Sequence, residues 1–165
     1  MKITYLPTIH PRSKSVRDTG SNSRMRHITR DVVYKNEWDS NLAEEVKKLF
    51  DEKAADCSIT RNIPARGVPV LDAFERGEVH GQRVVDLGAG TGLATQILIN
   101  KFESVVALDI SKEMIKNSVV LGTPQVCADG SRLPFASNSI DVFLDSLNPI
   151  SFEFGIVIFV GSSFF

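Results

Sequence analysis

A chain of 165 residues, 42% of them hydrophobic, can bury one core of ordinary size and leaves little room for a second independent domain. A formal net charge of −1 excludes a global field that would gather nucleic acid or a membrane surface, so we expect no specific nucleic-acid partner. No apolar run approaches the length of a membrane span. Cys57 and Cys127 are far apart in sequence and have no second Cys or His at ligand spacing, so neither a zinc site nor a disulfide framework is indicated, and a cytoplasmic protein without a metal fits best.

Residues 1–36 combine Ser, Arg, Pro and Gly with few large apolar side chains. Such a segment buries too little apolar surface to offset the entropy of ordering it, so we expect a flexible tail. The tail is basic, because residues 1–35 hold eight Lys or Arg against two Asp. Aromatic residues do not alternate with these charges, which predicts at most nonspecific attraction to phosphate groups.

Residues 37–79 predict two helices that could cover a ligand as a lid. Apolar residues from Leu42 onward recur at helical spacing, and Asn41 can cap the start of this helix. Glu44 can pair with Lys48 one turn later. A loop and a short second helix follow, the latter opened by a proline and ended by a glycine.

From residue 80 onward the sequence alternates compact β-branched runs with helical patterns. The expected elements are strands at 83–87, 104–109, 125–128 and 140–144, with helices at 93–101 and after Ser111. Strands and helices in this order imply right-handed crossovers, and hence a doubly wound parallel α/β sheet with helices on both faces.

The first of these strands runs directly into a glycine-rich turn. Glycines at 88, 90 and 92 remove Cβ atoms where the chain turns, so a ligand can approach the backbone and the N-terminus of the next helix. Taken alone, such a turn is also compatible with a tight strand-to-helix connection that holds no ligand. Asp109 closes the next strand, where a carboxylate can accept both hydroxyls of a ribose. Together the two features predict a nucleotide-like ligand.

The details of the turn distinguish between a dinucleotide and S-adenosylmethionine (SAM). The glycines are spaced G-x-G-x-G, and Leu93 stands where the third glycine of a dinucleotide fingerprint would be. Asp86, two residues before the turn, suits a ligand with an ammonium and a sulfonium better than a diphosphate. SAM is therefore the favoured cofactor, and a nicotinamide-dependent oxidoreductase is the less favoured alternative.

Residues 83–145 resemble the class I SAM-dependent methyltransferases, in particular the group with a type 11 methyltransferase domain. The resemblance rests on three segments in the family's order, namely 85–92, 106–111 and 127–135, the last followed by 139–143. It implies a Rossmann-like sheet and methyl transfer from SAM to a small-molecule acceptor. No catalytic residue can be named.

The same resemblance implies a set of cofactor-binding residues: Asp86, Gly88, Ala89, Gly90, Asp109, Ile110, Met114, Asp129 and Gly130. Gly88 and Gly90 would lie under the methionine part of SAM. Asp86 would hold the ammonium group indirectly or through water, and Asp109 would hold the ribose hydroxyls.

The remaining members of the set would surround the adenine. Ile110 and Met114 would lie on either side of the ring, Asp129 would accept its amino group, and the Gly130 amide would face a ring nitrogen. Each residue also has a structural alternative. Ile110 and Met114 can be ordinary core residues, and Asp129 can stabilise the turn before Gly130.

The resemblance ends near Asp145. Only 20 residues follow, too few for the strands and helices with which the family's domain continues, so we expect residues 80–165 to form a SAM-binding domain that is incomplete after its fourth strand. The apolar segment 156–160 could cover the open edge as a substitute strand, and it also has the composition of an aggregation-prone stretch. This leaves open a truncated, catalytically inactive SAM-binding fragment, and it predicts low solubility and weak turnover.

Overall fold

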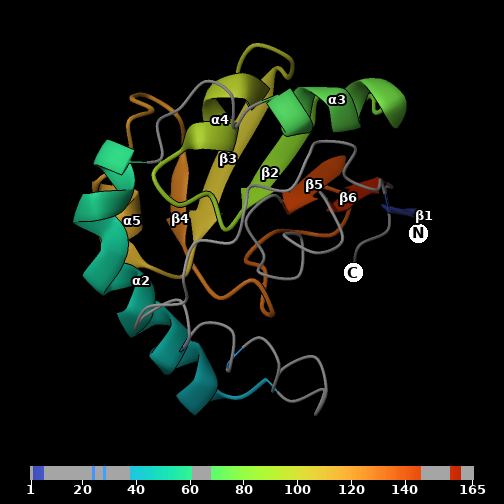
Figure 1. The fold of residues 1–165 in the computed structure, drawn as a ribbon. Helices are drawn as coiled ribbons and strands as arrows, with labels where there is room; N and C mark the ends of the chain where they lie inside the picture. The colour runs from blue at the N-terminus through green and yellow to red at the C-terminus, as the bar shows by residue number, and fades with distance from the viewer. Residues whose placement is uncertain are drawn as a thin grey trace.

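The computed structural model describes residues 2–5, 24, 28, 38–60, 68–145 and 157–160. Figure 1 shows how these segments form a twisted sheet with helices packed around it. In chain order the elements are β1 (Lys2–Tyr5), α2 (Ser40–Thr60), α3 (Val68–Arg76), β2 (Arg83–Leu87), α4 (Leu93–Leu98), β3 (Ser104–Asp109), α5 (Lys112–Lys116), β4 (Gln125–Cys127), β5 (Val142–Asp145) and β6 (Val157–Val160).

The sheet has the strand order β1-β6-β5-β2-β3-β4. Strand β2 lies at its centre and pairs in parallel with both β3 and β5, while β4 pairs in parallel with β3. The chain therefore runs outward from β2 through β3 to β4 and then returns to the other side of β2. This reversal confirms the doubly wound parallel arrangement predicted from the sequence, and it creates a topological switch point between β2 and β3 on one side and β5 on the other.

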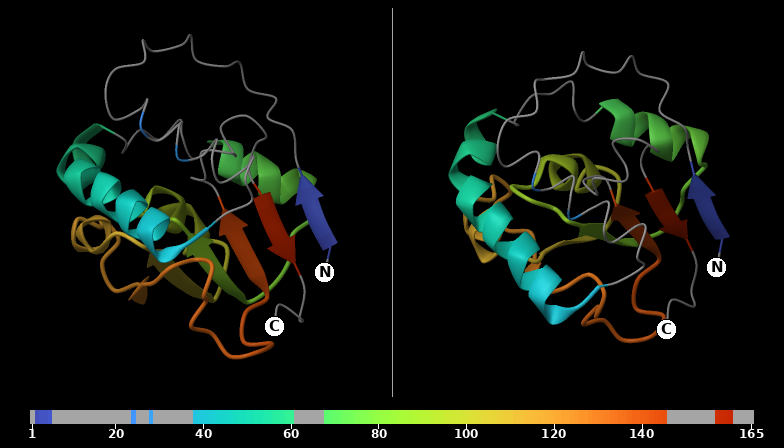
Figure 2. Two further views of the ribbon diagram at one scale, coloured as in Figure 1. Left: turned by 90° about the horizontal axis from the view of Figure 1, so that it is seen from below. Right: turned by 60° about the horizontal axis from the view of Figure 1, so that its bottom comes forward.

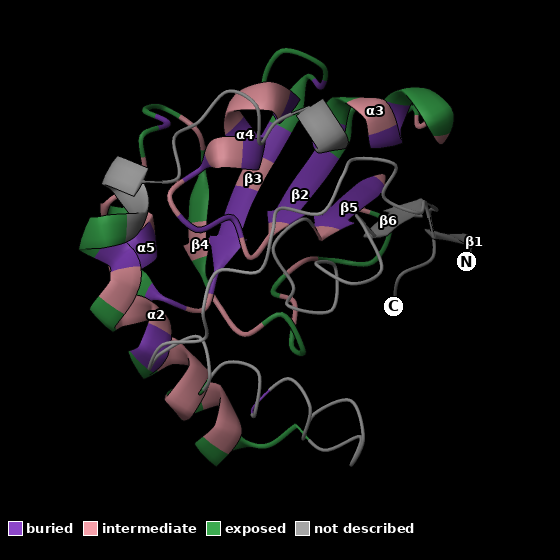
Figure 3. Ribbon diagram, viewed as in Figure 1, coloured by how far each residue is buried: buried purple, intermediate pink, exposed green. Residues whose placement is uncertain are grey.

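The central strands are the buried ones, as Figure 3 shows for β2, β3 and β5. Alternate residues of β2 face two different clusters. Val84 packs with apolar residues of α3 and α4, and Val85 packs with Phe143 and with partly buried apolar residues of the segment 128–140. Among the described residues, the segment 128–140 and not a helix covers this face of the sheet in the second cluster.

Two strands extend the parallel core on its β5 side. Strand β6 pairs antiparallel with β5, as expected of a substitute strand there, and β1 pairs antiparallel with β6. Both views in Figure 2 show β5, β6 and β1 side by side at one edge of the sheet, with α2 at the opposite side. Strand β1 lies inside the segment expected to be a flexible tail. An unpaired strand edge is a template for another strand, and β1 pairs with the edge of β6. This pairing joins the two ends of the chain, so no local pattern in the sequence predicts it.

Helix α2 differs in detail from its expectation. The carboxylate of Asp39 accepts the Leu42 amide at 2.8 Å, so Asp39 is the N-cap in place of Asn41. Glu44 pairs with Lys47, at 3.4 Å, instead of Lys48. The helix also continues to Thr60, into the stretch expected to be a loop. Both charged pairings are compatible with helical spacing, so the sequence alone does not distinguish them.

Asp141 joins the amino-terminal ends of β2 and β5. Its carboxylate accepts the backbone amides of Gln82 and Arg83 at 3.0 and 2.9 Å and pairs with the Arg83 guanidinium at 2.7 Å. The hydrogen bond from the Arg83 side chain is the largest of several influences that hold the pKa of Asp141 well below its usual range. Asp141 thus ties the residue before β5 to the start of β2.

Within the described residues, no helix is both long enough and apolar enough to cross a bilayer.

Candidate functional site

The glycine turn and Asp109 lie at the carboxyl ends of β2 and β3, where open α/β sheets bind their ligands. The glycine turn follows β2, and Gly88, Gly90 and Gly92 all have positive φ, at 66°, 56° and 92°. A side chain is strained in this region, which explains why the turn needs glycine. The turn is fastened to the next strand, because the Ala89 amide donates to the Leu108 carbonyl at 3.0 Å.

Gly92 has a different task from the other two glycines. A Cβ atom at this position would stand 2.7 Å from Cγ2 of Val120, so the missing side chain makes room for the segment after α5. That segment is also held to the turn, since the Val119 amide donates to the Thr91 carbonyl at 3.0 Å. Gly92 therefore serves packing, whereas Gly88 and Gly90 supply the positive φ that the turn requires.

Asp109 ties the glycine turn to the end of β3. One carboxylate oxygen accepts the Gly90 amide and the other accepts the Ser111 amide, each at 2.8 Å. The residue is only 6% exposed. Burial raises the pKa of Asp109, although the amides of Ser111 and Gly90 act in the opposite direction. The predicted juxtaposition of this acid with the turn is present, and each oxygen retains a lone pair for a further donor.

Asp86 is the most unusual group of the site. Its side chain is fully buried, and one carboxylate oxygen accepts the Thr95 hydroxyl at 2.6 Å. The other oxygen, Oδ1, has no hydrogen-bond partner among the residues that the structure describes. Burial raises the pKa of Asp86 to about 7, and the negative charges of Asp109 and Asp145 add to this effect while the Thr95 hydroxyl opposes it. An unpartnered buried carboxylate oxygen is costly for folding and well suited to a cationic or hydrogen-bonding ligand.

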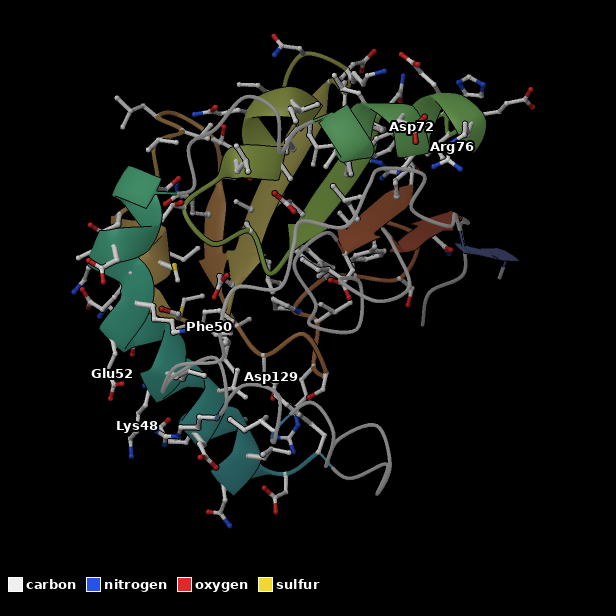
Figure 4. The ribbon with its side chains drawn as sticks, in the orientation of Figure 1. Lys48, Phe50, Glu52, Asp72, Arg76 and Asp129 are labelled. Atoms are coloured by element: carbon white, nitrogen blue, oxygen red, sulfur yellow. The ribbon has the colours of Figure 1, made fainter. Side chains whose placement is uncertain are left out.

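A cavity of about 410 Å³ lies between the start of α2 and the loop after β4. Its lining includes Trp38, Ser40, Lys47, Ile110, Asp129 and Arg132. Figure 4 shows Asp129 on the loop beside the first half of α2. Two of the residues expected at the adenine, Ile110 and Asp129, therefore share one cavity. A Cβ on Gly130 would meet no atom within 4 Å, so its backbone stands in the open.

The Asp129 carboxylate already has partners within the chain. The Ser131 amide donates to Oδ1 at 2.8 Å, as in the turn-stabilising alternative. The indole N–H of Trp38 donates to Oδ2 at 3.0 Å and to Oδ1 at 3.2 Å. Burial acts to raise the pKa of Asp129, but the hydrogen bonds from Ser131 and Trp38 hold it below its usual value, so the group is an ionised acceptor.

Met114 lies apart from this cavity lining. It is 2% exposed and packs with Ala54 and Phe50 of α2, and Figure 4 shows Phe50 on the face of α2 opposite to the exposed Lys48 and Glu52. The side chain thus has the core role that we weighed as the alternative, and its expected contact with the adenine stays a prediction.

Helix α2 is also docked through a polar contact that the sequence did not indicate. Asp51 accepts the Ser111 hydroxyl at 2.6 Å and the Glu113 amide at 3.2 Å, at the start of α5. Ser111 itself caps α5 by accepting the Met114 amide at 3.0 Å, as expected. The middle of α2 is therefore held against the start of α5, where Ser111 also donates its amide to Asp109.

Sequence reasoning missed three residues of this site: Trp38, Asp51 and Thr95. Thr95 offered a signal, since a hydroxyl on the inward face of the helix after the glycine turn needs a polar partner. Trp38 is the only tryptophan of the chain and directly precedes the cap of α2, which marks it as a helix-entry residue but does not reveal its partner. Asp51 and Trp38 contact residues 60 and 91 positions away.

Part of the chain is similar in sequence to known methyltransferases. Residues 85–147 match the family described as a methyltransferase domain. The chain is 38% identical over 104 residues to a demethylmenaquinone methyltransferase of Corynebacterium urealyticum, covering 59% of this chain and 44% of that protein. It is 35% identical over 105 residues to a malonyl-[acyl-carrier protein] O-methyltransferase of Halorhodospira halophila, covering 59% and 34%.

Among solved structures, the chain is similar to a SAM-dependent methyltransferase from Clostridium acetobutylicum, with a TM-score of 0.38 and 20% identity over 74% of this chain and 42% of that one. The chain spans less than half the length of the two curated relatives named above.

Proposed function

Because residues 85–147 belong to the class I SAM-dependent methyltransferases, we propose that this chain binds SAM and supports methyl transfer to a small-molecule acceptor. The observation that carries the proposal is the contact between Asp109 and Gly90, which joins an acidic strand end to a glycine turn. This pairing puts the Asp109 carboxylate beside the glycine turn at the switch point of the sheet, where a nucleoside is bound in folds of this kind.

The residues present fit the chemistry of SAM. Oδ1 of Asp86 is a buried acceptor without a partner in the described part of the chain, and the ammonium group of SAM could bond to it directly or through water. Gly88, Ala89 and Gly90 would lie beside the methionine part, and Asp109 would accept the ribose hydroxyls. We keep Ile110, Met114, Asp129 and Gly130 as the proposed adenine contacts, with Ile110 and Asp129 supported by the cavity that they share.

SAM supplies an electrophilic methyl group on a positively charged sulfur. We assign the described residues to binding and orientation. Holding donor and acceptor in line can itself lower the activation free energy of methyl transfer by about 7 kcal/mol or more. No described side chain is assigned as a general base.

The proposed acceptor remains a class rather than a compound. By their names, the relatives methylate demethylmenaquinone and a malonyl group on a carrier protein, which are different acceptors. We therefore propose a small molecule, free or attached to a carrier, in the cytoplasm. A nicotinamide-dependent oxidoreductase is not favoured, because both of these relatives are methyltransferases.

Replacing Asp109 by Ala should weaken binding of S-adenosylhomocysteine (SAH) about ten- to a hundredfold, the equivalent of a hydrogen bond to a charged group of about 1.5 to 3 kcal/mol. The loss of the Gly90 contact acts in the same direction, because the turn then loses one of its anchors. Isothermal titration calorimetry measures the affinity, and circular dichroism checks the fold.

Asp72→Ala is the matched control for this variant. Asp72 pairs with Arg76 on the surface of α3, at 2.6 Å, away from the glycine turn. This variant should bind SAH like the unaltered chain. An Asp109→Ala variant with unchanged affinity and an unchanged spectrum would remove Asp109 from the site and with it the main support for the proposal.

A further inference from the structure

Trp38 contacts the carboxylate that is proposed to accept the amino group of the cofactor's adenine. Its indole N–H donates to both oxygens of Asp129, and its ring lines the same cavity as Ile110. An indole and an adenine are alike in two respects that matter here. Both are flat aromatic systems, and both present an N–H that a carboxylate can accept.

The indole N–H of Trp38 spans both oxygens of the Asp129 carboxylate, at 3.0 and 3.2 Å. Oδ1 already accepts the Ser131 amide, and Oδ2 is the oxygen nearest to the indole nitrogen. An adenine amino group that is to bond the same two oxygens must displace the indole N–H, which lines the cavity beside them. The start of α2 forms the cavity wall beside the indole, and Asp39 caps this end of the helix by accepting the Leu42 amide.

We infer that Trp38 and Asp129 form a latch in which the indole competes with the adenine amino group of the cofactor for the Asp129 carboxylate, so that cofactor binding requires release of the start of α2. The inference rests on the proposed function. It assigns to residues 38–40 the role of a gate over the cofactor cavity. If the site is open in only a fraction of the molecules, the apparent Kd of the ligand equals the Kd of the open site divided by that fraction.

Trp38 is the only tryptophan in the chain, so intrinsic fluorescence reports on the latch directly and without a ligand. Replacing Asp129 by Ala removes the acceptor, and the indole emission should move to the red and become easier to quench with acrylamide. Glu44→Gln is the matched control, because Glu44 lines the same cavity but pairs with Lys47. Its emission should be that of the unaltered chain. Unchanged emission and quenching in Asp129→Ala would overturn the latch.

The competition is tested with ligands. Adenosine and SAH should move the emission of the unaltered chain toward that of Asp129→Ala. N6,N6-dimethyladenosine, which has no N–H on the amino nitrogen, should leave the emission unchanged. Trp38→Phe keeps an aromatic ring but no donor, and by calorimetry it should bind SAH roughly five- to tenfold more tightly than the unaltered chain.

The outcomes separate the two proposals. Equal or weaker SAH binding by Trp38→Phe, with clear binding by the unaltered chain, overturns the competition and leaves the proposed function intact. Absence of SAH binding by both proteins contradicts the proposed function, and the competition falls with it.

Discussion

Replacing Gly90 by Val should abolish binding of SAH. Gly90 is buried and has a φ of 56°, a conformation that a β-branched residue strongly disfavours. Its amide donates to Asp109, so any backbone movement that relieves the strain also displaces the carboxylate proposed for the ribose. The added side chain and the displaced acceptor both act against the ligand, and we expect affinity to fall at least a hundredfold, about 2.7 kcal/mol or more.

Gly122→Val separates this effect from simple backbone strain. Gly122 also has a positive φ, 82°, but a Cβ there would meet no atom within 4 Å, and the residue is exposed on the segment between α5 and β4. Both variants should lose stability, by about 1 to 3 kcal/mol for the strained conformation. Only Gly90→Val should lose SAH binding in calorimetry. Equal affinities in the two variants would show that the turn is not the cofactor cradle.

Replacing Asp86 by Asn should separate stability from binding. The native chain holds a proton on Asp86 up to about pH 7, whereas an ordinary aspartate, with a pKa of 3.8, has released its proton at that pH. Between these pH values the native state binds more protons than the unfolded chain, so rising pH lowers the free energy of unfolding. A difference of about three pH units corresponds to at most ~4 kcal/mol lost between pH 4 and pH 8.

The amide that this substitution introduces does not titrate, so the fall in stability from pH 5 to pH 8 should be smaller in Asp86→Asn than in the unaltered chain. Urea denaturation at the two pH values measures this difference. At pH 8 the variant should be as stable as the unaltered chain or more stable, yet bind SAH at least about tenfold more weakly, because the amide cannot offer a charged acceptor.

Asp72→Asn serves as control for the titration, because this aspartate lies on the surface of α3 in a pair with Arg76. It should leave the pH dependence of stability unchanged. If the free energy of unfolding of Asp86→Asn falls from pH 5 to pH 8 as much as that of the unaltered chain, Asp86 is not the group whose titration causes the fall. If it binds SAH normally, the unpartnered oxygen does not serve the cofactor.

The sequence predicted the parallel core well, because its signals are local. The strands at 83–87 and 104–109 have the expected bounds, and β-branched runs closed by glycine or by an acid rarely form anything else. The expected helix at 93–101 is shorter, since α4 ends at Leu98 and turns complete the segment. Element ends depend on tertiary contacts as well as on propensity.

The candidate site was predictable only in part. The pairing of Asp109 with the glycine turn follows from strand order, because adjacent parallel strands bring their carboxyl ends together. The contact of Trp38 with Asp129 depends on how α2 lies against the loop after β4, and no local pattern encodes that packing. The pairing of β1 with β6 is of the same kind, since it joins opposite ends of the chain.

The central claim, that this turn holds a SAM-type nucleoside, is tested most directly by calorimetric titration of the unaltered chain with SAH and, in parallel, with NAD. The account predicts saturable binding of one SAH per chain and no heat of binding with NAD, because the turn lacks the third glycine of a dinucleotide fingerprint and has Leu93 in its place. Binding of NAD, or absence of SAH binding by a folded chain, would contradict it.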